Sequence, residues 1–148
     1  MITETLNRQF KFDCDTKNLS IIRGNVTDVL AKNGVTGRDA SIIVLAIDET
    51  LSAIMLHAIE NNTRGDIVLQ LDVDKVRCKV TINDETGVCE MNGNGGKSLT
   101  EMLTAVTKMK KYQIGLLIMR EVIDEIYYNY KRGFQNEIVL LKFLSVKG

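Results

Sequence analysis

The stretch from Arg38 to Glu60 constrains the fold more than any other part of this sequence. Its apolar side chains recur at helical spacing and lie on nearly every side of the predicted helix, and the chain contains no proline. A helix that is apolar all round is usually buried. We therefore expect this segment to be the central helix of the core, with the other elements arranged around it.

One stripe of this helix carries side chains that are unusual in a core. Glu49, Ala53 and His57 follow one another at four-residue steps, and Asp48 stands beside the first of them. Positions four apart lie above one another on a helix face. We expect this face to line a ligand site. His57 itself is interpreted as a hydrogen-bonded core residue, because a lone histidine on an apolar face is more often structural than a ligand.

The remaining segments predict an α+β fold. Arg8–Cys14 alternates between polar and apolar residues, as expected for a half-buried outer strand, and the Asp74-Lys75 turn predicts an antiparallel hairpin. The order of elements predicts a two-layer sandwich, with helices packed on one face of a mixed, mainly antiparallel sheet. We expect one domain over residues 1–148, with a lid at about 85–113. The other expected elements are helices over Asn18–Lys32, Leu99–Met109 and Gly115–Glu125, and strands over Asp66–Val73, Lys75–Asn83, Ile126–Lys131 and Glu137–Ser145.

Composition excludes several classes of function. The 19 basic and 19 acidic residues balance, whereas nucleic-acid-binding proteins usually carry a basic surplus. Three cysteines without C-x-x-C spacing and a single histidine argue against a disulfide framework or a zinc site, and for a reducing compartment. No apolar run approaches the ~18 residues that span a bilayer. We expect a cytoplasmic protein without a direct nucleic-acid or membrane partner.

Four short motifs follow one another along the chain. Glu49 begins E-x-x-x-A-x-x-x-H, Asp84 opens a D-E-T-G segment that contains Gly87, Gln113–Leu116 reads Q-I-G-L before a predicted helix, and Gly133–Ile138 reads G-x-x-N-x-I. In this order they resemble the N box, the two glycine boxes and the closing strand of the GHKL-type ATPases, in particular the bacterial anti-sigma-factor serine/threonine kinases. The sequence departs from the family pattern at Ala53, which replaces the N-box Asn, and at three glycine positions, now Thr86, Val88 and Gln113.

The resemblance implies a role for each matching residue. Glu49 is expected to be the general base for attack on the γ-phosphate. Asp84 is expected to accept a hydrogen bond from the adenine amino group, although an aspartate in such a turn can also be purely structural. The family asparagine supplies an oxygen to Mg²⁺, and Ala53 has none. Asp48 or Ser52 could replace it, although adjacent helical positions point about 100° apart. The remaining nucleotide-binding positions that the resemblance implies are Gly87, Gly115, Leu116 and Asn136.

The resemblance also implies partners and cofactors. It implies ATP and Mg²⁺, a homodimer, a sigma factor or comparable client, and an anti-anti-sigma protein of the STAS class that is phosphorylated on Ser or Thr. A second hypothesis keeps the fold and the partner surface without catalysis, as an interaction module that binds nucleotide weakly or not at all. The substitution at Ala53 favours this second hypothesis, while retention of Glu49, Asp84 and Gly115 favours the first.

Overall fold

The computed structural model describes residues 6–60, 65–85, 121–131 and 135–145. Two long helices and five strands are found in this part of the chain, together with one short 3-10 helix. The elements in chain order are β1 (Leu6–Asp13), η1 (Thr16–Asn18), α1 (Leu19–Lys32), α2 (Gly37–Glu60), β2 (Asp66–Val73), β3 (Arg77–Asp84), β4 (Glu125–Lys131) and β5 (Gln135–Phe143).

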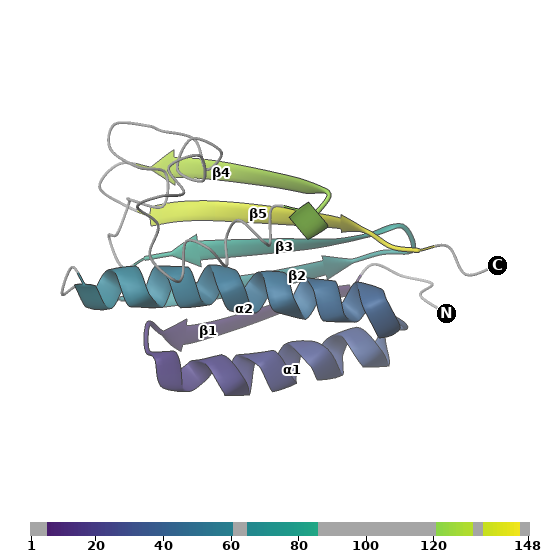
Figure 1. The fold of residues 1–148 in the computed structure, drawn as a ribbon, viewed down its shortest axis with the longest axis horizontal. Coiled ribbons are helices and arrows are strands. Elements are labelled where there is room, and N and C mark those ends of the chain that lie inside the picture. The colour runs from purple at the N-terminus through teal and green to yellow at the C-terminus, as the bar shows by residue number, and fades with distance from the viewer. Residues whose placement is uncertain (1–5, 61–64, 86–120, 132–134, 146–148) are drawn as a thin grey trace.

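The strands form one sheet in the order β1-β2-β3-β5-β4, with α1 and α2 side by side on one of its faces (Figure 1). The predicted α+β fold with helices on one face of a sheet is therefore confirmed. Each pairing between the described strands is antiparallel, so no parallel pair is found in this part of the sheet. The predicted hairpin is the β2–β3 pair, and β1 is an outer strand, as expected.

The core lies between the sheet and α2. Alternate residues of β2 and β3 point into it, because side chains of a strand alternate between its two faces. Helix α1 adds a narrower stripe of buried residues at helical spacing. The buried residues from these four elements include Ile67, Leu69, Leu71 and Val73 of β2, Cys78, Val80 and Ile82 of β3, Ile22, Val26 and Leu30 of α1, and Ile43, Ile47, Leu51, Ile54 and Met55 of α2.

Helix α1 ends where the sequence predicted. Gly34 follows the helix with a positive φ of 82°, and the backbone N–H of Val35 donates to the carbonyl of Leu30 at 2.9 Å. Glycine is favoured there because a side chain disfavours that backbone conformation. This tight end returns the chain so that α2 packs back against α1.

Three expectations are corrected by the structure. Helix α2 is not covered on every side by the described residues, since Leu45, Leu56 and Ile59 remain exposed. The helix expected to end at Glu125 ends earlier, because Glu121 and Val122 are helical and Glu125 is the first residue of β4, paired with Leu141. Strand β5 begins at Gln135, within the segment expected to be a connection. Cross-strand pairing, which local patterns do not reveal, moves both boundaries.

The lid expected at about 85–113 and the helix expected over Leu99–Met109 lie almost wholly outside the described residues. Among the described residues, no helix is long and apolar enough to cross a membrane.

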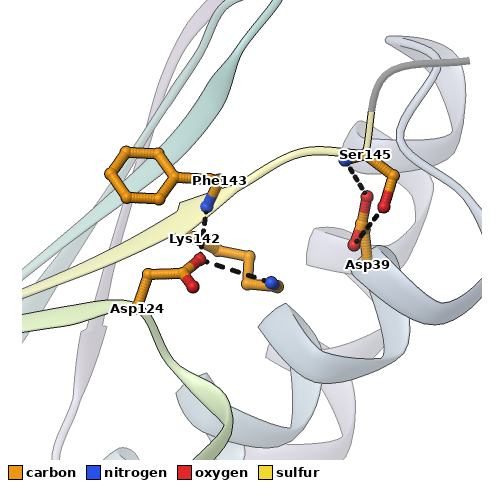
Figure 2. A network of polar contacts seen from close by, with 5 residues as sticks. All are labelled: Asp39, Asp124, Lys142, Phe143 and Ser145. Atoms are coloured by element: carbon orange, nitrogen blue, oxygen red, sulfur yellow. Dashed lines mark hydrogen bonds and ion pairs between the residues drawn. The ribbon is translucent and has the colours of Figure 1, made fainter.

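Polar contacts join the end of β5 to the start of α2 and to the segment before β4 (Figure 2). The Asp39 carboxylate, in the first turn of α2, accepts hydrogen bonds from the backbone N–H of Ser145 at 2.7 Å and from its hydroxyl at 3.4 Å. The Asp124 carboxylate accepts from the backbone N–H of Phe143 at 2.6 Å and lies 3.3 Å from Nζ of Lys142. The Asp39 contacts hold the segment after β5 against the beginning of α2, and the Asp124 contacts hold β5 against the segment before β4.

Candidate nucleotide site

Asp84 is the most deeply buried acidic residue of the candidate site. It is the last residue of β3 and continues the inward-facing series Cys78, Val80 and Ile82, so its side chain lies on the helix-facing side of the sheet with 1% exposure. The backbone N–H of the next residue, Glu85, donates to the carbonyl of Asp66 at 2.9 Å and holds the end of the strand. A carboxylate is costly to bury unless polar groups satisfy it, so the position of Asp84 indicates a polar environment at the end of β3.

The sheet register brings two predicted site residues together. Asp84 of β3 is directly opposite Asn136 of β5, although the two are far apart in the sequence. On its other side Asp84 is opposite Ile67 of β2. The end of the sheet thus places a buried acid beside the apolar side chain of Ile67.

The pKa of the Cys14 thiol is affected by the negative charges at this end of the sheet. Its pKa is raised from 9.0 to about 11, mainly by burial and next by the negative charge of Asp84. Asp13 and Asp15 contribute in the same direction. Burial and these negative charges keep the thiol of Cys14 protonated near neutral pH.

The predicted stripe of α2 is only partly accessible. Glu49 is half-buried, whereas Ala53 is 0% exposed and belongs to the hydrophobic core. The neighbouring Thr50 is also buried, and its hydroxyl donates to the carbonyl of Ala46 at 2.7 Å. His57 lies in the helix, but its side chain is not among those described. Among the described side chains of this stripe, Glu49 is thus the polar one that is partly exposed.

Asp48 lies on the α1 side of α2. Its Oδ1 accepts hydrogen bonds from Nη2 of Arg23 at 2.9 Å and from Nε at 3.3 Å. Both residues line a groove of about 360 Å³ between the two helices, together with Thr27, Ala40, Ser41, Val44 and Leu45. Sequence reasoning missed Arg23, and the only signal for it was an exposed basic position on the predicted first helix.

The residues present do not fit the magnesium site of the resemblance. Mg²⁺ takes six oxygen ligands in a nearly regular octahedron, several of them from water and phosphate. Ala53 supplies no oxygen, and the Asp48 carboxylate is bound to Arg23. Among the described residues, no group of three or more His, Cys, Asp or Glu side chains is placed to hold a metal ion. A metal role for Asp48 stays a prediction that its ion pair does not favour.

Three other predicted positions lie outside the described residues. These are Gly87 of the first glycine box and Gly115 and Leu116 of the second. Their roles stay predictions, as do those of Glu49, Asp84 and Asn136. The structure brings Asp84 and Asn136 together in the sheet and places Asp48 on the flank of α2 that faces α1.

Comparison with known proteins shows one matching family and several similar relatives. The sequence model of the family described as histidine kinase-like ATPase domain matches residues 12–142. The anti-sigma F factors of Bacillus thuringiensis (strain Al Hakam) and Bacillus cytotoxicus are each 24% identical to the chain over 135 residues, covering 91% of this chain and 90% of theirs.

A solved structure is also similar in fold. A chain in the crystal structure of the SiaB-SiaC complex from Pseudomonas aeruginosa superimposes with a TM-score of 0.62. The match covers 91% of this chain and 88% of that one, at 13% sequence identity. At this identity the likeness concerns the fold alone.

Proposed function

The chain belongs to the histidine kinase-like ATPase domain family, and we propose that it is a nucleotide-binding regulator of the anti-sigma-factor type. In this proposal it holds a sigma factor or comparable client, and an anti-anti-sigma protein of the STAS class competes for it. The anti-sigma F factors, which the chain matches over 90% of their length, support this choice within the family. By the same analogy the protein acts as a homodimer.

The single observation that carries nucleotide binding is the placement of Asp84. Asp84 has 1% exposure at the end of β3, directly opposite Asn136, and this supports the role in adenine recognition that the resemblance implies for it. A carboxylate accepts hydrogen bonds only, and the exocyclic amino group of adenine donates them. The surrounding apolar residues strengthen such a bond because they exclude water.

Other residues would complete the ATP site. In the proposal Asn136 lies beside Asp84 under the nucleotide, and backbone amides near Gly115 and Leu116 approach the phosphates. Amide groups at a helix N-terminus favour anions, because their N–H groups are unpaired and the helix dipole is positive there. Gly87 allows the chain to approach the base closely, since it has no side chain.

Serine/threonine kinase activity is the second candidate, and the retention of Glu49 favours it. Glu49 is half-buried on α2, so its carboxylate remains available to a substrate. In a transfer reaction it would take the proton of a Ser or Thr hydroxyl on the STAS partner, the hydroxyl oxygen would attack the γ-phosphorus, and ADP would leave. The mismatch at the metal position argues for nucleotide binding as the primary function and for transfer as the second.

Calorimetric titration with ATP tests the proposal. The full chain should bind ATP, and Asp84→Asn should weaken binding by about 1.5–3 kcal/mol, the range for a hydrogen bond to a charged group. Asp28→Asn is the matched control, because Asp28 is an exposed acid on α1, and it should bind as the unaltered chain does. A thermal melt of each variant checks that it folds. Equal affinity of Asp84→Asn and the control would refute adenine recognition by Asp84.

A phosphorylation assay separates the second candidate. Radiolabelled ATP would be incubated with the chain, with Glu49→Gln and with STAS-domain proteins. Label transferred by the chain and lost in Glu49→Gln would establish the kinase. ATP binding without any transferred label would leave the non-catalytic regulator as the function.

A further inference from the structure

We infer that this site binds its adenine nucleotide without a divalent cation held by α2, so that affinity does not depend on Mg²⁺. The inference rests on the proposed nucleotide binding and specifies its chemistry. It follows from three features of the described residues: what occupies position 53, where the Asp48 carboxylate is bound, and what remains at Asp84.

Position 53 has become part of the hydrophobic core. Ala53 is 0% exposed, and its neighbours Ile54 and Met55 are equally buried. Its methyl group offers no lone pair and is closed off from solvent. The place where the resemblance puts a metal-binding oxygen is therefore filled by an apolar group inside a close-packed interior.

Asp48 cannot serve the metal without losing its own partner. Its Oδ1 accepts two hydrogen bonds from the Arg23 guanidinium, at 2.9 and 3.3 Å. A side chain at position 48 also points about 100° away from one at position 49. In Figure 1, α1 lies on one side of α2, and β3 and β5 lie on the other. The hydrogen bonds to Arg23 turn the Asp48 carboxylate toward α1.

Neither hydroxyl nearby supplies a replacement: Ser52 is half-buried but points about 100° away from position 53, and Thr50 is buried. The Thr50 hydroxyl is 0% exposed and donates its hydrogen to the carbonyl of Ala46. Glu49 then remains as one carboxylate, and a single carboxylate leaves nearly all of the coordination of Mg²⁺ to water and phosphate. The resemblance assigns this carboxylate to the attacking hydroxyl rather than to the cation.

The base-binding end, by contrast, is retained. Asp84 keeps its buried position and its register opposite Asn136. Binding through the base needs no cation, because the acceptor is a carboxylate and the donor is an amino group. The two ends of the proposed site therefore differ. The adenine end has the Asp84 carboxylate that the family pattern requires, whereas the metal end on α2 has Ala53 in place of the ligand asparagine.

Titration of the full chain with ATP, once in Mg²⁺ and once in EDTA, tests the inference. The dissociation constants in the two buffers should differ by less than about threefold. A larger loss of affinity in EDTA would overturn the inference while leaving the proposed nucleotide binding intact. Absence of binding in both buffers would instead refute nucleotide binding, and the inference with it.

Two further measurements identify the origin of any metal dependence. Asp48→Asn should leave the dissociation constant in Mg²⁺ unchanged, as should the control Asp28→Asn, and a selective loss of more than about threefold in Asp48→Asn would overturn the inference. Electron paramagnetic resonance of Mn²⁺ with ATP, with and without the chain, provides a readout independent of affinity. The spectrum of Mn²⁺-ATP should not acquire a protein-coordinated component, and the appearance of one that Asp48→Asn or Glu49→Gln removes would contradict the inference.

Discussion

Nη2 of Arg23 in α1 lies 2.9 Å from Oδ1 of Asp48 in α2, and this ion pair joins the two helices across their shared groove. It determines the direction of an acidic side chain that stands next to the predicted catalytic Glu49. The pair therefore holds Asp48 on the α1–α2 surface, whereas the place of its neighbour Glu49 in the candidate site stays a prediction.

Breaking this ion pair should change stability only slightly. The Arg23 side chain is 49% exposed and that of Asp48 is 24% exposed, so solvent screens their attraction. A double-mutant cycle with Arg23→Gln and Asp48→Asn, measured by urea unfolding, should give a coupling energy of about 0.2–1 kcal/mol that decreases with added salt. A larger, salt-independent coupling would mean that the pair is shielded from water.

Introducing the family residue at position 53 should destabilise the protein. Ala53→Asn places an amide in a fully buried site without a described polar partner, and leaving such a group unsatisfied costs about 1–3 kcal/mol. Ala31→Asn at an exposed position of α1 is the matched control for the lower helix propensity of Asn, and should cost less than about 1 kcal/mol. Urea unfolding measures both. Equal costs would show that position 53 accommodates the amide, as an open metal-ligand position would.

The contact between Asp39 and Ser145 should hold the end of the chain against α2. Asp39→Ala removes both hydrogen bonds to Ser145 and an acid from the first turn of the helix, so the free energy of unfolding should fall by about 1 kcal/mol. Amide hydrogen exchange at Ser145 should become faster. Ser145→Ala loses only the hydroxyl contact of 3.4 Å and should change stability less, and the opposite ranking would assign the stabilisation to the hydroxyl.

The buried thiol of Cys78 should be inert in the native protein. Burial, followed by the charges of Asp72 and Asp74, raises its pKa from 9.0 to about 12. The thiolate is the reactive form, so iodoacetamide at pH 8 should modify Cys78 only after unfolding, as mass spectrometry of digests can measure. Because the folded pKa is the higher one, this thiol stabilises the fold fully below pH 9.0 and progressively less as the pH rises toward 12. Rapid labelling of Cys78 in the native state would contradict its burial.

Local pattern was sufficient for much of the fold. The alternation in Asp66–Val73 and the helical spacing in α1 and α2 are properties of consecutive residues, and the structure confirms each of these elements. The end of the helix before Glu125 was predicted wrongly, because that boundary depends on the pairing of Glu125 with Leu141, a distant residue. The four ordered motifs were enough to identify the family, since collinear motifs depend on residue identity alone.

The arrangement of the candidate site was decided by the tertiary structure. The sequence determined that Asp48, Glu49 and Asp84 are present and that Ala53 lacks a ligand oxygen. It did not determine that Arg23 binds the Asp48 carboxylate or that Asp84 lies opposite Asn136, because these pairs join segments far apart in the chain. The packing of α1 on α2 and the register of β3 with β5 produce both pairs. Side-chain type is therefore set locally here, whereas the direction and partner of each acid depend on how distant elements pack.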